Sequence, residues 1–200
     1  GIQEVVDTPL QIDSSNVKAL EAGLRYYNGR TIVNSVNGKE KSLQSVLPLV
    51  KKYGACVVGL TLDERGIPST AEGRFEIAKK IVERAEIYGI KRSDIFIDCL
   101  SLTVSAQQSE AMETIKAIKM LKEKLGCKTI LGVSNISFGI PNRPALNNTY
   151  LNLMLYAFKV TPEKFGGAKL DENIVKECLN DLINFIKDEL GVELKTFNFL

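Results

Sequence analysis

Short apolar runs alternate with longer amphipathic stretches along this chain. Runs rich in β-branched residues favour strands, and a 3.6-residue apolar period favours helices, so the pattern predicts repeated βα units around a parallel sheet. We expect about six such units in an α/β fold. The predicted strands lie near 9–13, 31–35, 55–60, 94–98, 129–134 and 192–198. The predicted helices cover 15–27, 40–53, 70–88, 106–124, 144–158 and 171–190.

Glycines and hydroxyl residues mark where these helices begin and end. A glycine follows most of the predicted helices, as expected for a left-handed C-cap. Ser14 or Ser15 is the expected N-cap of the first helix, and Ser69 with Glu72 forms an expected capping box before the third. The composition shifts at 160–167, which we interpret as a joint. We therefore expect 1–158 and a loop-helix-strand unit at 159–200 to pack into one domain.

Composition and charge narrow the class of protein. The chain has 200 residues, of which 44% are hydrophobic and 25% charged, and its net charge is +2. No basic stripe is present, so we expect no nucleic-acid partner. The apolar runs are far shorter than the roughly 20 residues that span a bilayer, and the first residues do not resemble a secretory signal. A cytoplasmic location without membrane contact is the resulting expectation.

Cysteine and histidine limit the available chemistry. The four cysteines form no Cys-x-x-Cys pair, which argues against a zinc knuckle or a dithiol redox centre. The chain contains no histidine, the commonest general base and zinc ligand. We therefore predict no bound metal, and any reaction must rely on carboxylates, amides, hydroxyls or groups of the ligand.

Four predicted strands end in a carboxylate or a carboxamide. Ligands of parallel α/β proteins bind at the carboxyl ends of the strands, so these side chains could meet one small molecule. Asp98 could instead cap the loop at Ser101, and Asn37, before Gly38, could serve only a turn. The four side chains at the strand ends are Asp13, Asn34, Asp98 and Asn135.

The segment 132–143 is the most specific stretch of the sequence. A strand ends there in Ser134-Asn135, and a long loop with glycine and proline leads to Arg143 and to the next helix. Connections between strand and helix usually have roughly 2–6 residues, so the length of this one indicates a functional loop. A phosphate or nucleotide site is disfavoured, because no Gly-x-Gly-x-x-Gly or P-loop motif follows a strand.

Four motifs together resemble the pterin-binding methyltransferase domain of cobalamin-dependent methionine synthases and of related methyltetrahydrofolate:corrinoid methyltransferases. The resemblance covers about residues 2–158. The motifs are Pro-Leu-Gln-Ile-Asp-Ser-Ser-Asn, Ile-Val-Asn-Ser-Val-Asn-Gly, Ile-Phe-Ile-Asp and Leu-Gly-Val-Ser-Asn-Ile-Ser-Phe-Gly-Ile-Pro-Asn-Arg. The resemblance implies a domain with a TIM-type barrel fold that transfers the N5-methyl group of methyltetrahydrofolate to cob(I)alamin. It also implies that a separate domain supplies the cobalamin.

The resemblance also implies roles for individual residues. Asn135 corresponds to the asparagine that reaches N5, where it would stabilise developing charge as the catalytic residue. The implied substrate-binding residues are Asp13, Asn34, Asp98, Gly132, Asn135 and Arg143. No metal ligand is implied in this chain.

The strand count departs from the family barrel, which has eight strands. The matched segments correspond to its third to seventh strands, so we expect either a partial TIM barrel or a rearranged, open flavodoxin-like sheet. Exposed sheet edges would favour pairing between chains, which predicts a homodimer as one outcome. The alternative function is a truncated or engineered α/β chimera, joined near residue 160, that keeps the site residues but has lost catalysis.

Overall fold

A computed structural model describes the chain except for residues 1, 6, 104–107, 140–141 and 158–200. Its strands are β1 (Gln11–Asp13), β2 (Ile32–Asn37), β3 (Cys56–Leu60), β4 (Ile95–Asp98) and β5 (Lys128–Ile130). Its α-helices are α1 (Val17–Tyr26), α2 (Glu40–Tyr53), α3 (Ala71–Ile87), α4 (Gln108–Met120) and α5 (Arg143–Ala157). Short 3-10 helices at Ile2–Glu4, Arg92–Asp94 and Val133–Ser137 and a π-helical turn at Leu121–Leu125 complete the described elements. The predicted helix 171–190 and strand 192–198 lie outside the described residues.

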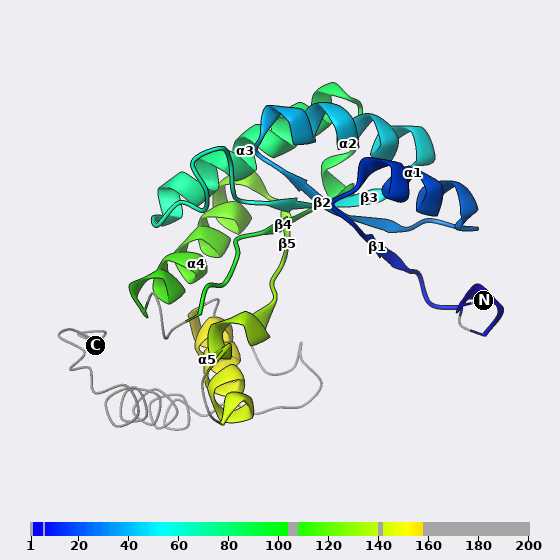
Figure 1. The fold of residues 1–200 in the computed structure, drawn as a ribbon. Coiled ribbons are helices and arrows are strands. Elements are labelled where there is room, and N and C mark those ends of the chain that lie inside the picture. The colour runs from blue at the N-terminus through cyan, green and yellow to red at the C-terminus, as the bar shows by residue number, and fades with distance from the viewer. Residues whose placement is uncertain (1, 6, 104–107, 140–141, 158–200) are drawn as a thin grey trace. The chain divides into compact units, whose positions relative to one another are not determined.

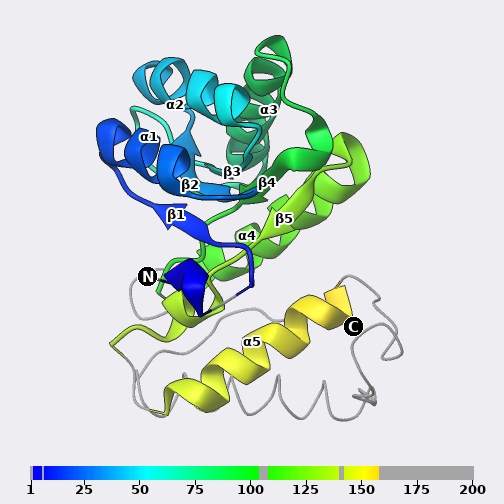
Figure 2. The same cartoon turned by 90° about the vertical axis from the view of Figure 1, so that its right-hand side faces the viewer.

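The five described strands form one open, parallel sheet in the order β1-β2-β3-β4-β5 (Figures 1 and 2). Helices α1, α2 and α3 lie over the same face of this sheet. Sequential order with helices on one face is the arrangement of a TIM-barrel wall, whereas a flavodoxin-like sheet has the order 2-1-3-4-5. The predicted α/β class and the open parallel sheet are confirmed, and the strand order is that of the barrel.

The chain divides into two compact units, which we describe separately. The first comprises 1–100 and 112–132 and holds the whole sheet. The second comprises 101–111 and 133–200, of which 101–103, 108–111, 133–139 and 142–157 are described. In the second unit α5 packs on the 3-10 helix Val133–Ser137, and the Tyr150 hydroxyl donates to the Ala111 carbonyl at 3.3 Å. The predicted boundary at 158/159 lies outside the described residues, which end at Ala157.

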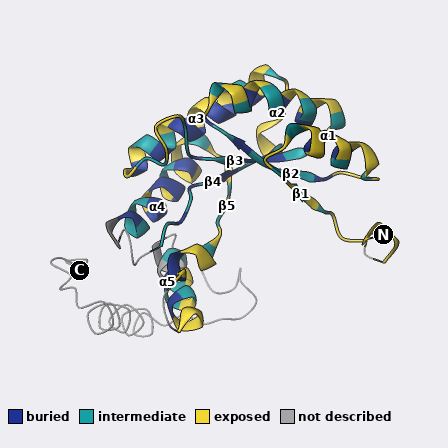
Figure 3. Cartoon of the chain, in the orientation of Figure 1, coloured by how far each residue is buried: buried dark blue, intermediate teal, exposed yellow. Residues whose placement is uncertain are grey.

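The core of the first unit lies between the sheet and the helices. Helix α2 buries Leu43, Val46, Leu47 and Val50, the i, i+3, i+4, i+7 spacing of one helical face. Figure 3 shows the buried positions along α2, α3 and the central strands. Each fully buried aliphatic side chain of this kind contributes about 1.5–3 kcal/mol. The buried strand residues are Val33, Val36, Val57, Val58, Ile95 and Ile97.

The helix caps differ from those predicted. Asn16 caps α1, because its Oδ1 accepts hydrogen bonds from the amides of Lys18 and Ala19. Thr70 caps α3 by accepting from the Gly73 amide, so the predicted capping box with Ser69 and Glu72 is wrong by one position. An N-cap needs extended backbone and a side-chain oxygen beside the N2 or N3 amide, and several adjacent polar residues compete for that place.

Among the described residues, every helix is too short or too polar to traverse a lipid bilayer.

Gly38 joins β2 to α2 at a position without space for a side chain. Its amide donates to the Leu62 carbonyl at 2.8 Å, and a Cβ atom added there would lie 2.7 Å from Cγ2 of Ile77. We therefore expect Gly38→Ala to lower the free energy of unfolding by about 1–3 kcal/mol, the usual cost of overpacking. Urea denaturation measures this loss, and an unchanged midpoint would show that α3 yields without strain.

Candidate functional site

Asp98 projects from the sheet face opposite the helices. Ile97, the residue before it, pairs with Gly59 of β3. A Cβ on Gly59 would lie 3.0 Å from Ile81 of α3 and 3.1 Å from Ile97, so this side of β3 and β4 faces the helix. Because successive side chains of a strand point to opposite faces, Asp98 extends from the other side, at the carboxyl end of β4.

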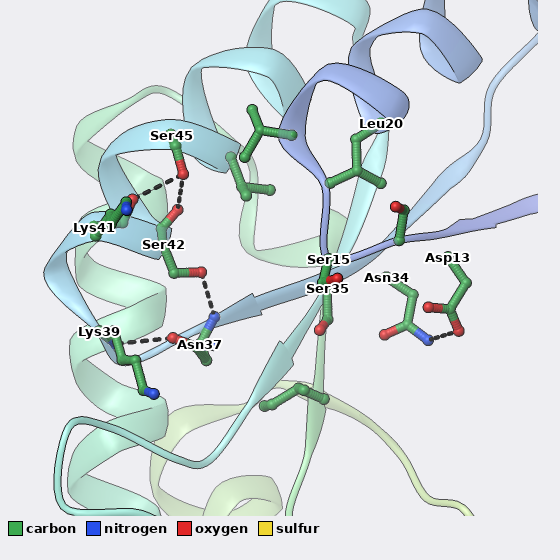
Figure 4. Close-up of a pocket in the computed structure, with 14 residues that line it drawn as sticks. Asp13, Ser15, Leu20, Asn34, Ser35, Asn37, Lys39, Lys41, Ser42 and Ser45 are labelled. Carbon is green, nitrogen blue, oxygen red and sulfur yellow. Dashed lines mark hydrogen bonds between the residues drawn. The ribbon is translucent and has the colours of Figure 1, made fainter.

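Asp13 and Asn34 form a polar corner at the same end of the sheet. They are register partners on β1 and β2, and Nδ2 of Asn34 donates to Oδ2 of Asp13 at 3.0 Å (Figure 4). Ile12, the residue before Asp13, contacts α1, since a Cβ on Gly23 of that helix would lie 3.1 Å from Ile12. Asp13 therefore points away from the helices, as Asp98 does.

An apolar strand end separates this corner from Asp98. Val58 of β3 pairs with Asn34, and Leu60, two residues further on, pairs with Asp98. Neighbouring strands lie about 4.8 Å apart, so β2 and β4 are separated by roughly 10 Å across this strand. Val58 is buried and Leu60 is half-buried, so Leu60 forms the apolar floor. This edge of the sheet, which we call the rim, thus offers hydrogen-bonding groups on both sides of that floor, which suits a flat heterocycle.

A pocket of about 430 Å³ opens beside the Asp13 and Asn34 corner. This volume is in the range of small-molecule sites. Asp98 is not among its lining residues, whereas residues of α1 and α2 are, so the pocket lies where these two helices meet β1 and β2. The residues that line it are Asp13, Ser14, Ser15, Val17, Leu20, Asn34, Ser35, Asn37, Lys39, Lys41, Ser42, Ser45, Val46 and Leu60.

Hydrogen bonding fixes which groups the corner can present. Because the Asn34 amide nitrogen donates to Asp13, its Oδ1 and the carboxylate of Asp13 are oriented as acceptors. Asn37, by contrast, accepts from the Lys39 amide at 3.0 Å through its own Oδ1, which favours the turn interpretation of that residue. The corner can therefore accept hydrogen bonds from N–H groups.

Asp98 is half-buried and acts in part as a cap. Its Oδ1 accepts from the Leu100 amide at 2.8 Å, and among the described residues no hydrogen bond reaches Oδ2. Burial raises the pKa of Asp98, and the hydrogen bond from the Leu100 amide opposes this shift. The cap and ligand interpretations are compatible, because each uses a different carboxylate oxygen.

The remaining predicted residues lie beyond β5. Gly132 is exposed and ends the first unit, whereas Asn135 and Arg143 belong to the second. Asn135 is exposed within the 3-10 helix Val133–Ser137. Arg143 donates to the Ser137 hydroxyl at 3.1 Å and to the Ser134 carbonyl at 3.0 Å. The arginine thereby braces the loop that carries Asn135.

Arg74 of α3 is a residue that the sequence interpretation missed. Its side chain is fully buried and donates hydrogen bonds to the carbonyls of Cys99 and Leu100, directly after Asp98. A signal was available, since Arg74 occupies the same helical face as the apolar Ile77, Ala78 and Ile81. An arginine in such a stripe indicates carbonyl acceptors inside the protein.

The cysteine beside Asp98, Cys99, is not suited to act as a thiolate nucleophile. Burial raises the pKa of the Cys99 thiol to about 12, and neighbouring Asp98 adds to the shift. A thiol in such surroundings stays protonated and unreactive. Among the described residues, no group of three or more His, Cys, Asp or Glu side chains could hold a metal ion.

Comparisons with known proteins identify relatives of this chain. Methionine synthases of Mycobacterium leprae (strain TN) and Mycobacterium tuberculosis (strain ATCC 25618 / H37Rv) are 39% and 38% identical over 157 residues, which cover 72% of this chain and 13% of each relative. Methylcorrinoid:tetrahydrofolate methyltransferase of Eubacterium limosum is 32% identical over 158 residues, which cover 78% of this chain and 58% of that protein. The chain thus spans about an eighth of the methionine synthases.

The family model described as pterin binding enzyme matches residues 1–160. This range includes all five strands and every rim residue named above. The comparisons give no support to the alternative of a chimera. The chain belongs to the pterin-binding enzyme family.

Proposed function

We propose that the chain binds methyltetrahydrofolate at this rim and takes part in methyl transfer between the N5 atom of the pterin and a corrinoid. The observation that carries the proposal is the set of acceptors from Asp13, Asn34 and Asp98 around an apolar floor, in a chain of the pterin-binding family. A reduced pterin has N–H donors along its ring edge and a flat face, so both features have a counterpart.

The chemistry assigns separate tasks to the two parts of the site. Transfer breaks the bond between N5 and the methyl carbon, and the electron pair remains on N5, which must be protonated or strongly hydrogen-bonded to leave. In this proposal Asn135 stabilises the charge at N5 as it develops. Asp13, Asn34 and Asp98 hold the ring in this proposal, while Gly132 and Arg143 support the loop that carries Asn135.

The corrinoid is supplied by another domain or protein in this proposal. The chain has no histidine to serve as a lower ligand. The names of the relatives describe the synthesis of methionine and a methyl transfer between a methylcorrinoid and tetrahydrofolate. Methyl transfer to or from the pterin passes through the same charge at N5, so the same side-chain roles apply.

Calorimetric titration of the full chain with methyltetrahydrofolate tests the binding step. We expect saturable binding that weakens by about 10–100-fold in Asn34→Ala, because the variant removes one ligand acceptor and leaves Asp13 without its partner. Asn28→Ala, at an exposed asparagine, is the matched control and should bind like the wild type. No binding of the wild type at millimolar ligand, or tighter binding of ATP, would reject the proposal.

A further inference from the structure

We infer that Arg74 is a positioning residue for Asp98, because it fixes the turn whose amide orients that carboxylate. The expected effect on ligand binding rests on the proposed function. The geometry of the turn is independent of that function. Every contact that carries it lies within the first unit.

The guanidinium of Arg74 connects three segments of the chain. Its Nε donates to the Pro68 carbonyl at 2.8 Å, on the loop before α3. Its Nη1 lies 3.0 Å from the Cys99 carbonyl and 2.9 Å from the Leu100 carbonyl, at the end of β4. The same nitrogen contacts the Thr114 hydroxyl of α4. A planar guanidinium presents several donors in a fixed geometry, so it can hold these groups simultaneously.

Leu100 is the residue through which this network reaches Asp98. Its φ of 60° lies in the left-handed region, which is unfavourable for a branched, non-glycine side chain. Two donors hold its carbonyl, Arg74 and the Thr114 hydroxyl, the latter at 3.2 Å. Arg74 also holds the Cys99 carbonyl, which shares a planar peptide unit with the Leu100 amide, and that amide donates to Oδ1 of Asp98. The other carboxylate oxygen is then oriented for a ligand.

Thr114→Val is the most selective test of this role. It removes the hydroxyl that links Arg74 to Leu100, and it changes neither charge nor much volume. We expect methyltetrahydrofolate affinity to fall about tenfold, the effect of losing one well-oriented hydrogen bond to a carboxylate. Thr114→Ser keeps the hydroxyl and should retain wild-type affinity. In an Asp98→Ala background, which leaves no oxygen for the Leu100 amide to orient, Thr114→Val should cause no further loss, because the residue acts through Asp98.

A titration without ligand separates this inference from the proposed function. The pKa of Asp98, followed by NMR with carboxyl-labelled aspartate, should rise in Thr114→Val, because the lowering hydrogen bond from Leu100 is lost. Thr149→Val is the control, since the Thr149 hydroxyl donates only within α5, to the Ala145 carbonyl at 2.9 Å. If wild type binds no pterin, the proposed function fails while this titration still reports on the turn.

Two results would overturn the inference. One is an Asp98 titration in Thr114→Val identical to that of the wild type. The other is an equal loss of affinity from Thr114→Val in the wild-type and Asp98→Ala backgrounds. If Thr114→Val does not fold, Arg74→Lys is the second test, with the same expected rise in the pKa of Asp98. Lysine keeps the positive charge but lacks the planar guanidinium that bonds the carbonyls of Cys99 and Leu100.

Discussion

Asn135→Ala is expected to slow methyl transfer between methyltetrahydrofolate and a corrinoid by about 10²–10³-fold, the usual effect of removing one donor that stabilises charge in a transition state. Ligand affinity should change far less, because charge at N5 develops only as the methyl group leaves. Asn135 is exposed on the 3-10 helix Val133–Ser137, so truncation of its side chain leaves no buried cavity. Single-turnover spectroscopy with free cob(I)alamin measures the rate.

Asn148→Ala provides the matched control, because Asn148 is an exposed asparagine on α5. Equal rates for the two variants would remove Asn135 from the mechanism. A wild-type chain that binds methyltetrahydrofolate but shows no transfer would favour the alternative of a chain that retains the site residues without catalysis. The two outcomes are separable, because binding and transfer are measured independently.

Asp98→Asn is expected to weaken methyltetrahydrofolate binding by about 10–100-fold while making the protein more stable near neutral pH. The loss of affinity follows from replacing a charged acceptor by a neutral one. The gain in stability follows from burial, which raises the pKa of Asp98 above its ordinary value of 3.8. The Leu100 amide can still donate to the Oδ1 atom of asparagine, so the turn keeps its hydrogen bond.

The raised pKa of Asp98 makes the stability of the wild type depend on pH. Between 3.8 and the raised pKa of Asp98, the folded protein holds a proton that the unfolded chain has lost. The free energy of unfolding therefore decreases as the pH rises through this range. Asparagine cannot ionise, so the advantage of Asp98→Asn should appear above this range and disappear below pH 3.8.

Urea denaturation at several pH values measures the difference in stability between Asp98→Asn and the wild type. Asp7→Asn, at an exposed carboxylate near the N-terminus, controls for the change in net charge. A variant that is less stable than the wild type at about pH 7 would mean that the charged carboxylate of Asp98 supports the fold. Burial of that carboxylate would then carry no net cost, contrary to the raised pKa.

The elements of the first unit were predictable because local signals agreed with the tertiary structure. The prediction of 40–53 for α2 matches Glu40–Tyr53, since an apolar face ends at Gly54, which adopts the left-handed conformation with φ of 64°. β5 is shorter than the predicted 129–134, because the chain enters a 3-10 helix at Val133. A short apolar run does not by itself distinguish a strand from a helical turn.

The rim residues were predictable individually, whereas their connections were not. Periodicity placed Asp13, Asn34 and Asp98 at strand ends, which is correct for Asp13 and Asp98, whereas β2 continues past Asn34 to Asn37. The register partnership with Asp13 nevertheless brings Asn34 beside the end of β1. The apolar surroundings of Arg74 on its helix indicate buried carbonyl acceptors, but they do not identify the carbonyls of Cys99 and Leu100. The turn that presents these carbonyls depends on the left-handed conformation of Leu100, which strand and helix patterns do not encode.

The hydrogen bond between Asp13 and Asn34 lowers the conformational entropy that these side chains lose when a ligand binds. The two side chains already restrain one another before any ligand arrives, so binding need not immobilise them afresh. Ordering a flexible side chain at an interface costs about 0.5–1.5 kcal/mol, and this corner avoids much of that entropy loss. A ligand should therefore find the same rotamers in the free protein that it contacts when bound.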